Sequence, residues 1–299
     1  MAAVLLLPVQ ANALSARQAV ALEPVTGRHL FEREPAARAR MASTTKIMTA
    51  LLICEQCNVL DRMRIPKEAV GIEGSSMYLQ EGEVLTLQEL LYGLMLSSGN
   101  DAAVALAIYC GGTVEGFVAR MNDKARTLGL KDTHFANPNG LDAPDHYSSA
   151  ADLAALGAYA MENPIFAKTV STKTVQAGGR ALRNHNKLLW LLPGAEGIKT
   201  GFTKAAGRIL VSSAQRQGRR LVAATMDAPD DWRDHQVLLE AGFADFRIVP
   251  IISAGEQLGM RTILGGAGKV RLVAGEDFSF TLAQGEQPQI VIGGQNFAY

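Results

Sequence analysis

The chain has 299 residues, of which 48% are hydrophobic and 19% charged, and its 29 basic and 29 acidic side chains give a net charge of zero. This length allows one large or two smaller domains with a substantial core. The balanced charge argues against a general nucleic-acid surface, and the ordinary glycine and proline contents argue against disorder. No apolar run reaches the roughly 18 residues that predict a membrane-spanning helix.

The first 16 residues carry no charged side chain. An apolar run extends from Ala2 to Val9, and Ala11-Asn12-Ala13 has the small-x-small pattern of a signal-peptidase cleavage site, although the usual basic segment is missing. We interpret residues 1–16 as the remnant of a secretory signal. This predicts an exported protein on the extracytoplasmic, cell-wall or membrane-associated side of the cell.

The next segments predict a hairpin of strands followed by helices. Residues 18–23 and 28–34 are two short runs separated by a turn that ends at Gly27. Helices are then predicted at residues 43–53, 86–95 (opened by the capping box Thr86-Leu-Gln-Glu89), 101–109 and 115–128. A further helix begins at Ser149 and ends before Pro164.

Strand patterns return in the second half of the chain. Residues 208–214 and 219–226 alternate or run apolar and predict an antiparallel hairpin, and residues 234–246 predict an amphipathic helix. Strands at both ends with helices between them indicate an α+β domain, in which an antiparallel sheet is flanked by helices and carries a helical lobe. We expect this catalytic domain to span residues 17–249.

Residues 250–299 have a different composition. Nine glycines fall between Gly255 and Gly294, around strand-like runs at residues 270–273, 278–282 and 289–292. This segment is short and rich in glycine for an independent sheet. We predict a short, partial β-rich C-terminal domain.

The three cysteines are Cys54, Cys57 and Cys110. Their small, odd number excludes a disulfide-rich scaffold. Cys54 and Cys57 have the spacing of a metal or redox pair, but the sequence has no second CxxC and no HExxH to complete a zinc site. We therefore expect no metal site and interpret these two as largely buried side chains at the end of a helix.

The first candidate catalytic motif is Ser43-Thr-Thr-Lys46, at the start of a predicted helix. Residues three apart on a helix share one face, so Lys46 can reach the Ser43 hydroxyl. That hydroxyl is a weak nucleophile until a base removes its proton, and a lysine can be the base when burial or another cation lowers its pKa. The helix dipole at the first turn also favours a developing oxyanion. Taken alone, the motif is far more typical of a helix-capping serine beside a solvated lysine.

Two further motifs each occur once in the chain. Ser98-Gly99-Asn100 lies between two predicted helices, where the serine can relay a proton and the amide can hold a substrate carbonyl, although alone it is also typical of a polar turn. Lys199-Thr200-Gly201 lies at the start of the β region. There the glycine allows a ligand backbone to approach an edge strand, while the lysine and threonine suit an anionic group.

The ordered set of three motifs is far more specific than any one of them. With its flanking residues it resembles the serine-type D-alanyl-D-alanine carboxypeptidases of peptidase family S11, the low-molecular-mass penicillin-binding proteins. The resemblance covers about residues 17–246. The matching segments are Met41–Ala50, Ser75–Leu79, Leu96–Ala102, Asn137–Leu141, His146–Ser148, Asn184–Trp190 and Gly197–Thr203.

The resemblance implies a fold like that of penicillin-binding proteins and β-lactamases, the transpeptidase fold. It implies a D,D-carboxypeptidase that removes the terminal D-alanine from peptidoglycan stem pentapeptides during cell-wall synthesis or remodelling. The expected partners are a stem peptide ending in D-Ala-D-Ala and β-lactam antibiotics as covalent inhibitors. Neither a metal nor an organic cofactor is expected, and no nucleic acid.

The resemblance also implies roles for individual residues. Ser43 would attack the carbonyl between the two D-alanines, Lys46 would take its proton, and Ser98 would help to pass a proton to the leaving amine. Asn100 would position the acyl group, and Lys199 would stabilise charge in the cleft.

Further implied roles concern the strand that carries the third motif. Thr200 and Thr203 would bind the terminal carboxylate beside Gly201, and the backbone N–H groups of Ser43 and Phe202 would form the oxyanion hole. Phe202 stands where some relatives have a histidine.

His185 stands where some relatives have an arginine near the substrate carboxylate. A histidine donates fewer fixed hydrogen bonds and can be neutral at pH 7, so carboxylate binding is expected to be weaker or sensitive to pH. We interpret the other histidines as structural or surface residues: His29, His134, His146 and His235.

Relatives commonly end in a full second β domain and an amphipathic helix that docks on the membrane. The sequence ends at Tyr299 without such a helix, so it gives no support for membrane anchoring.

Two alternative functions stay open. A β-lactamase or related SxxK serine esterase would need a glutamate that activates the deacylating water, and Glu162 lies before Asn163-Pro164 without the expected surroundings. A non-catalytic peptidoglycan-binding protein would keep the fold without the reaction. Rapid turnover of penicillin would favour the first alternative, and peptide binding without D-alanine release would favour the second.

Overall fold

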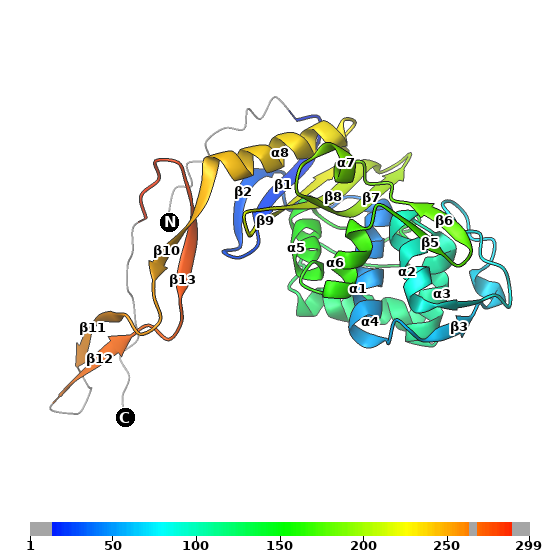
Figure 1. The fold of residues 1–299 in the computed structure, drawn as a ribbon, viewed down its shortest axis with the longest axis horizontal. Helices are drawn as coiled ribbons and strands as arrows, with labels where there is room; N and C mark the ends of the chain where they lie inside the picture. Colours follow the sequence, from blue (N-terminus) through cyan, green and yellow to red (C-terminus); the bar gives the residue numbers. More distant parts are fainter. Residues whose placement is uncertain (1–13, 263–267, 289–299) are drawn as a thin grey trace.

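The computed structural model describes residues 14–262 and 268–288. Its main body is built on a five-stranded antiparallel sheet with helices on both faces (Figure 1). The strand order is β2 (Arg28–Arg33), β1 (Gln18–Glu23), β9 (Arg219–Met226), β8 (Gly207–Arg216) and β7 (Ala195–Thr203). Both predicted hairpins are present, and β7, which carries the third motif in its second half, forms one edge of the sheet.

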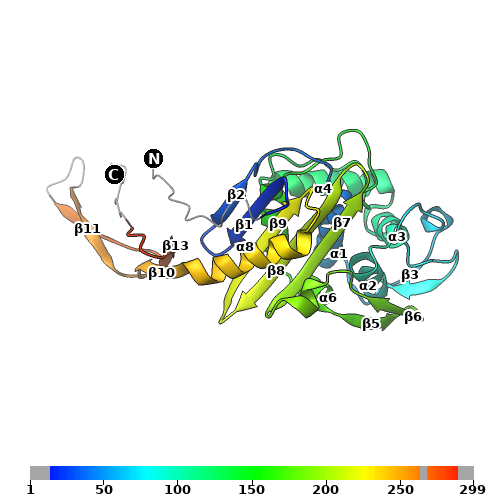
Figure 2. The ribbon, with the colours of Figure 1, turned by 90° about the horizontal axis from the view of Figure 1, so that it is seen from above.

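Two layers of helices cover the sheet, as Figure 2 shows from above. The long helix α8 (Asp231–Asp245) crosses one face, and the short helix α7 (Leu188–Leu191) packs on that same face. On the opposite face lie α1 (Lys46–Gln56) and α5 (Ala150–Ala160). One hydrophobic cluster fills each interface between helices and sheet. Strand β7 is therefore packed against side chains on both of its faces, and its outer edge is free.

A helical lobe extends from the α1 side. Its elements are β3 (Arg62–Arg64), η3 (Lys67–Ala69), β4 (Val84–Thr86), α2 (Leu87–Leu96), α3 (Asn100–Gly111), α4 (Val114–Thr127), α6 (Pro164–Ser171), β5 (Thr174–Ala177) and β6 (Arg180–Arg183). The predicted capping box opens α2, because Thr86 Oγ1 accepts from the Glu89 N–H at 3.2 Å and the Glu89 carboxylate accepts from the Thr86 N–H at 2.8 Å.

The helix predicted at residues 43–53 is wrong at its start. A 3-10 helix, η2 (Ala42–Thr45), carries Ser43, and the α-helix α1 begins only at Lys46. The tighter 3-10 turn is common at helix N-termini and brings side chains three residues apart nearly into line. Ser43 and Lys46 therefore still face the same side.

The predicted limit of the fold at residue 17 is three residues too late. Leu14 is buried, Ser15 donates from its backbone N–H and its hydroxyl to Asp234 at 2.8 Å each, and the Ala16 N–H donates to the same carboxylate. This long-range pairing with α8 is not visible in local composition. Residues 1–13, the rest of the predicted signal remnant, lie outside the described residues.

After α8 the chain forms two small antiparallel ribbons that extend away from the main body (Figure 1). The pairs are β10 (Phe246–Ile252) with β13 (Phe278–Ala283), and β11 (Gln257–Thr262) with β12 (Lys269–Val273). A hydrogen bond of 2.9 Å from the Thr281 hydroxyl to the Glu23 carboxylate ties the first ribbon to the main sheet.

The sequence analysis anticipated these ribbons in part. The runs at residues 270–273 and 278–282 are strands, and the run at 289–292 lies outside the described residues. The boundary expected before residue 250 falls inside β10. Pro250 is tolerated there because each strand of a two-stranded ribbon has one free edge. Proline has no N–H, and none is needed for pairing at that edge.

No single helix in residues 14–262 and 268–288 is long and apolar enough to cross a membrane. Helices α3 and α4 meet the length and composition requirement together, but the chain bends by 84° between them.

Candidate active site

Ser43 lies beside a buried amine. The Lys46 Nζ atom is 2.9 Å from Ser43 Oγ, and it donates to Asn100 Oδ1 at 2.7 Å and to the backbone carbonyl of Asn139. The Lys46 side chain is fully buried. Burial lowers the pKa of Lys46 well below its ordinary value, the charge of Lys199 lowers it further, and Asp101 opposes the shift.

The second motif joins α2 to α3 directly beside this amine. Ser98 is buried and has a backbone φ of +61°, an uncommon conformation for a residue other than glycine. The Asn100 N–H donates to the Ser75 carbonyl at 2.7 Å, and its side-chain amide donates to the Glu73 carbonyl at 2.6 Å. These bonds orient the Asn100 carbonyl oxygen toward Lys46.

The third motif lies along the outer edge of β7, next to Ser43. A Cβ atom on Gly201 would lie 3.3 Å from the Ser43 backbone nitrogen and 3.3 Å from the Met41 carbonyl oxygen. Glycine therefore allows the strand to approach the start of η2 closely, whereas the sequence analysis expected it to admit a ligand backbone. Lys199, two residues before it, is buried, and burial lowers its pKa to about 7.

Alternation along β7 separates the two threonines that were both expected to hold a carboxylate. Lys199 and Gly201 face the helical lobe, so Thr200 points toward the opposite face of the sheet, where it lines the cleft. Thr203 instead accepts from the Ala206 N–H at 3.0 Å and donates to Asp142 at 3.4 Å. The structure brings Thr200 to the cleft and engages the Thr203 hydroxyl elsewhere.

Phe202 and His185 both line the cleft. Phe202 is exposed, whereas His185 is held by a backbone hydrogen bond of 3.2 Å to the Leu96 carbonyl. Burial lowers the pKa of His185, and the nearby charge of Lys199 lowers it further. His185 is thus a neutral hydrogen-bonding group at neutral pH and a poor substitute for a cation.

The sequence analysis missed two groups that shape the serine and its lysine. The Asn139 carbonyl accepts from Lys46, and Gly140, with φ of +91°, lies so close to η2 that a Cβ atom would be 1.9 Å from the Ala42 carbonyl oxygen. Both lie in the segment Asn137–Leu141, which was noted for its resemblance but given no role. Its Asn-Pro-Asn-Gly turn composition was the available signal.

His146 and Asp101 support the site from behind, and sequence reasoning assigned neither a position. His146 Nδ1 accepts from the Ala136 N–H at 2.9 Å, and Nε2 lies 2.8 Å from the Thr45 hydroxyl. Burial lowers the pKa of His146 to about 4. Asp101 accepts from the backbone N–H groups of Met77 and Leu79, which fixes the loop over α3.

The cleft beside Ser43 has a volume of about 850 Å³. Ser43 and Ser98 lie on one side, Thr200 to Phe202 form the strand edge, and residues from β6, α7, β8 and α8 continue it. Lys46, Lys199 and Asn100 are buried against these side chains. The arrangement combines a nucleophile, a neighbouring base of lowered pKa and an exposed strand edge for an extended peptide.

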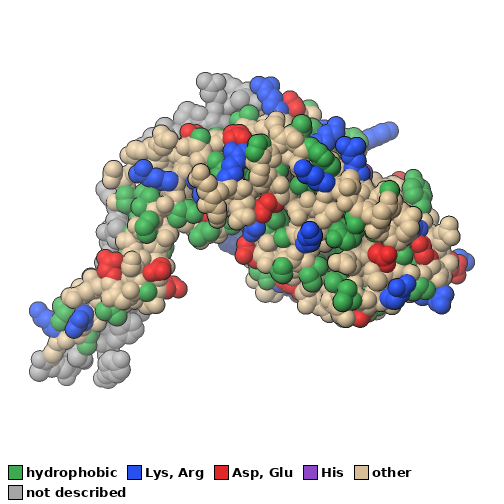
Figure 3. Space-filling view, viewed as in Figure 1, with side chains coloured by type: hydrophobic (Ala, Val, Ile, Leu, Met, Phe, Trp, Pro, Cys, Tyr) green, Lys and Arg blue, Asp and Glu red, His purple; other side chains and the backbone are tan. Residues whose placement is uncertain are grey.

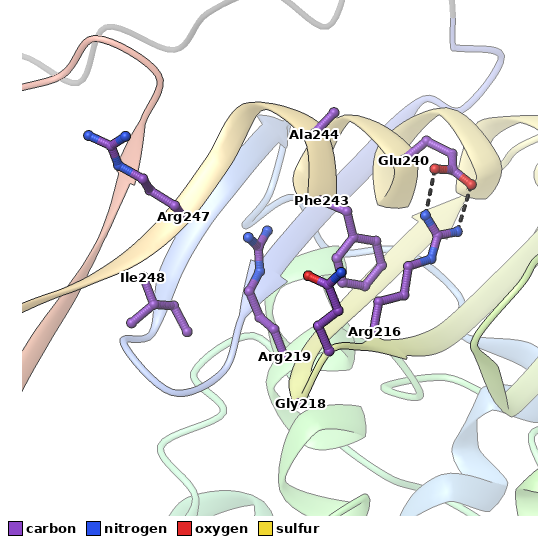
Figure 4. A pocket seen from close by; sticks show the side chains of 9 residues that line it. Arg216, Gly218, Arg219, Glu240, Phe243, Ala244, Arg247 and Ile248 are labelled. Atoms are coloured by element: carbon purple, nitrogen blue, oxygen red, sulfur yellow. Dashed lines mark hydrogen bonds and ion pairs between the residues drawn. The ribbon is translucent and has the colours of Figure 1, made fainter.

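A second hollow, of about 680 Å³, lies where the β8–β9 turn meets α8 and β10 (Figure 4). Arg216 and Glu240 form a bidentate ion pair on one side, with bonds of 2.7 and 2.6 Å, and the Arg219 guanidinium donates to two backbone carbonyls. The residues that line it include no nucleophile. The cleft at Ser43 is the candidate active site.

In the described part of the chain, no group of three or more His, Cys, Asp or Glu side chains is placed to hold a metal ion. Cys54 is buried and Cys57 caps the end of α1, as the sequence suggested. Burial raises the pKa of each of these thiols to about 12, which makes both unreactive at neutral pH.

Comparison with known proteins places this geometry in a family. Residues 7–230 match the family model of Peptidase S11, D-alanyl-D-alanine carboxypeptidase. The chain is 34% identical to the D-alanyl-D-alanine carboxypeptidase DacF of Bacillus subtilis (strain 168), over 91% of this chain and 73% of that protein. It is 35% identical to DacD of Salmonella typhimurium, over 94% of this chain and 76% of that protein.

Solved structures agree. Penicillin binding protein 5 from Haemophilus influenzae superposes with a TM-score of 0.85 at 33% identity, covering 94% of this chain and 85% of that one. The predicted α+β fold and the resemblance noted in the sequence are thereby confirmed. The chain belongs to the D-alanyl-D-alanine carboxypeptidases of family S11, which are penicillin-binding proteins.

Proposed function

We propose that this carboxypeptidase works by a serine mechanism, in which Ser43 forms an ester with the penultimate D-alanine of a peptidoglycan stem pentapeptide. The observation that carries the proposal is the contact between Ser43 Oγ and the buried amine of Lys46, at 2.9 Å. The Oγ atom attacks the peptide carbonyl, the C–N bond breaks and terminal D-alanine leaves. Water then hydrolyses the ester and releases the tetrapeptide.

Lys46 is the base in this proposal. A neutral lysine amine has two N–H bonds and one lone pair. Two acceptors, Asn100 Oδ1 and the Asn139 carbonyl, use the N–H bonds, which leaves the lone pair for the Ser43 proton. The lowered pKa of Lys46 supports a neutral amine at neutral pH, because burial and the charge of Lys199 both disfavour protonation.

The other predicted residues have supporting roles. Ser98, which lines the cleft, relays a proton to the leaving amine, and Asn100 positions the acyl group. Thr200 and the charge of Lys199 hold the terminal carboxylate, while Gly201 admits the substrate backbone. The N–H groups of Ser43 and Phe202 stabilise the oxyanion.

This reaction uses only side chains, backbone N–H groups and water, so the expectation of no cofactor stays part of the proposal. The substrate is outside the cytoplasm, and an exported location on the cell-wall or membrane side is proposed accordingly. β-Lactams are proposed as covalent inhibitors, because their strained amide resembles the D-Ala-D-Ala end.

The test is intact-protein mass spectrometry after mixing with benzylpenicillin, together with an assay of D-alanine release from a pentapeptide. Wild type is expected to gain the mass of one penicillin and to release D-alanine, and Ser43→Ala to do neither. An adduct of equal mass on Ser43→Ala would exclude Ser43 as the nucleophile. Peptide binding without D-alanine release by wild type would support the non-catalytic alternative.

The β-lactamase alternative needs Glu162 to activate a water beside Ser43, and the position of Glu162 does not support this role. Glu162 pairs with Arg220 at 3.2 Å and is largely exposed, and it lines a different hollow beside β1 and α5. A long-lived penicillin adduct is therefore expected rather than rapid turnover. Fast release of penicilloate by wild type would reverse this assignment.

A further inference from the structure

The helical lobe carries a pair of cysteines that lies away from the cleft. On the face that Figure 3 shows, acidic and basic side chains are mixed over this lobe, so that face presents no surface of a single charge to a partner. The three cysteines of the chain are free thiols. Two of them, Cys57 and Cys110, are partly exposed, and the proposed reaction at Ser43 does not involve them.

Helices α1 and α3 bring these two cysteines together. The helices pack side by side, and contacts at both ends show that they run in the same direction. At the start of the helices, Lys46 Nζ donates to Asn100 Oδ1 at 2.7 Å. At their ends, the Cys110 thiol donates to the side-chain oxygen of Gln56 at 3.6 Å, and Cys57 is the next residue after Gln56. The helices have 11 and 12 residues, so their last turns lie next to each other.

The side chains of Cys57 and Cys110 are in direct contact. Burial, and after it a hydrogen bond to the Cys110 side chain, raise the pKa of Cys57 to about 12. Both residues pack against the edge of the core, whereas Cys54, one turn earlier on α1, is buried. The CxxC spacing pointed to Cys54 as the partner of Cys57. The backbone leaves the helix at Cys57, however, and the thiol to which Cys57 is hydrogen-bonded is that of Cys110.

Arg120 on α4 completes the surroundings of the pair. Its Nη1 atom donates to Cys110 Sγ at 3.8 Å and to Gln56 Oε1 at 3.2 Å. The Arg120 charge also lowers the pKa of Cys57, against the larger effect of burial. A thiol must become a thiolate before it can attack a disulfide, and a neighbouring guanidinium stabilises that charge. The pair thus combines direct contact, partial exposure and a nearby cation.

We propose that Cys57 and Cys110 form a disulfide that joins the ends of the two helices whose first residues build the catalytic site. Disulfides persist in exported proteins, so the presence of this bond in the cell rests on the proposed location outside the cytoplasm. The bond closes a loop of about 50 residues, which disfavours the unfolded chain. Lys46 and Asn100 lie about 15 Å away along the helices, so the bond stabilises the support of the site without changing the reacting groups.

The oxidant is itself a disulfide, either a small molecule such as oxidised glutathione or the disulfide of a thiol oxidoreductase. The Cys110 thiolate attacks one oxidant sulfur, the oxidant S–S bond breaks, and one oxidant thiolate leaves and takes up a proton. The Cys57 thiolate then attacks the Cys110 sulfur of the mixed disulfide and releases the second oxidant thiol. The protein loses two hydrogens and two electrons, and the oxidant gains them.

The order of these two steps follows from the contact between the thiols. While Cys110 is free, its hydrogen bond and its charge both help to keep Cys57 protonated. Once the Cys110 sulfur is part of a mixed disulfide, these two contributions are removed and only burial still raises the pKa of Cys57. Cys110 therefore reacts first, and Cys57 resolves the intermediate.

The test treats the purified, reduced protein with oxidised glutathione at mildly alkaline pH. Remaining thiols are blocked with iodoacetamide in denaturant, and unreduced peptides are mapped by mass spectrometry. A peptide that links Cys57 to Cys110 is expected, with Cys54 alkylated. The thermal midpoint of the oxidised protein is expected to lie about 5–10 °C above that of the reduced protein, because the bond closes a long loop. Release of D-alanine at room temperature is expected to be equal in the two forms.

Two variants sharpen the test. Cys110→Ser is expected to lose both the linked peptide and the difference in thermal midpoint. Cys54→Ala is the matched control, since it changes a cysteine one turn from Cys57 and is expected to keep both. Each variant is compared with itself in oxidised and reduced form, so a change in its intrinsic stability does not affect the result.

The outcomes separate this proposal from the proposed function. Three alkylated cysteines after oxidation, or a link from Cys54 to Cys57 or between two copies of the chain, would overturn the proposal. An unchanged midpoint, or loss of D-alanine release on oxidation, would overturn the stabilising role of the bond. The peptide map does not depend on activity, so the linked peptide in a protein that releases no D-alanine would count against the proposed function alone.

Discussion

Two buried lysines lie close enough in this site for the charge of one to change the pKa of the other. Burial lowers the pKa of Lys199 to about 7, and both burial and the charge of Lys199 lower the pKa of Lys46. The two residues have opposite requirements: Lys46 must be neutral to accept a proton, while Lys199 must be charged to attract a carboxylate. Sequence identifies both lysines but not these pKa values, because burial is a property of the folded chain.

This arrangement predicts a limited pH range for acylation. As pH rises through about 7, Lys199 loses its proton, so kcat/KM for the pentapeptide is expected to fall on the alkaline side. As pH falls through the lowered pKa of Lys46, its amine becomes protonated and the rate falls again. Measuring kcat/KM from acid to alkaline pH checks both limbs, and a constant value from pH 7 to pH 9 would contradict the role of the Lys199 charge.

At the scale of elements, η2 is held in place by strand β7 and by a loop segment, both from distant parts of the sequence. Gly140 packs against the Ala42 carbonyl, Gly201 packs against the Ser43 backbone, and the Thr45 hydroxyl lies beside His146. The nucleophile is therefore positioned by the backbone of two other elements. Local sequence at residues 42–46 could not reveal this.

Gly140→Ala is expected to slow acylation of Ser43 by more than about 100-fold. The added Cβ would lie 1.9 Å from the Ala42 carbonyl oxygen, so η2 must shift, and a small misplacement of a reacting group costs roughly this factor. The φ of +91° adds backbone strain to the steric conflict. The measurement is the second-order rate of benzylpenicillin adduct formation.

Gly129→Ala is the matched control for that variant. Gly129 also has a positive φ, of +69°, but a Cβ atom there meets nothing within 4 Å. The control carries the strain without the collision, and its acylation rate is expected to equal that of wild type. Similar rates for Gly140→Ala and Gly129→Ala would show that contact with η2 does not position Ser43.

At the scale of the whole molecule, neutral histidines are buried where layers meet. His235 on α8 lies 2.5 Å from the Ser212 hydroxyl of β8 and 2.9 Å from the Thr225 hydroxyl of β9, and it joins the helix to the sheet. Burial lowers the pKa of His235 to about 3. As the sequence suggested, His146 and His235 are structural residues.

Because of these buried histidines, we expect acid to lower the free energy of unfolding before the pH is low enough to protonate most carboxylates. A histidine with an unfolded-state pKa near 6.5 takes up a proton below that pH only when the chain unfolds, so stability is present above pH 6.5 and is lost as pH falls toward 3. Between pH 7 and pH 5, His235 lowers the free energy of unfolding by about 2 kcal/mol. Urea unfolding of wild type and His235→Gln at both pH values tests this, and an equal decrease in the two proteins would contradict it.

Much of the architecture follows from local sequence patterns. The two hairpins of the main sheet, the capping box of α2 and the helix that ends at Gly129 depend on neighbouring residues, so their signals survive in the sequence. Edges and short elements were less predictable. Strand β10 pairs with β13, about 30 residues farther along the chain, and residues 14–16 belong to the fold through Asp234.

The sequence by itself determined which groups are available for chemistry, because the three motifs place a serine, two lysines and an asparagine in a recognisable order. The tertiary structure decided what those groups can do. It buried Lys46 and Lys199, paired Thr203 with Asp142 and brought Thr200 into the cleft. The reason is physical: hydrogen-bonding groups are fixed by residue type, whereas burial, pKa and charge balance depend on which distant elements pack together.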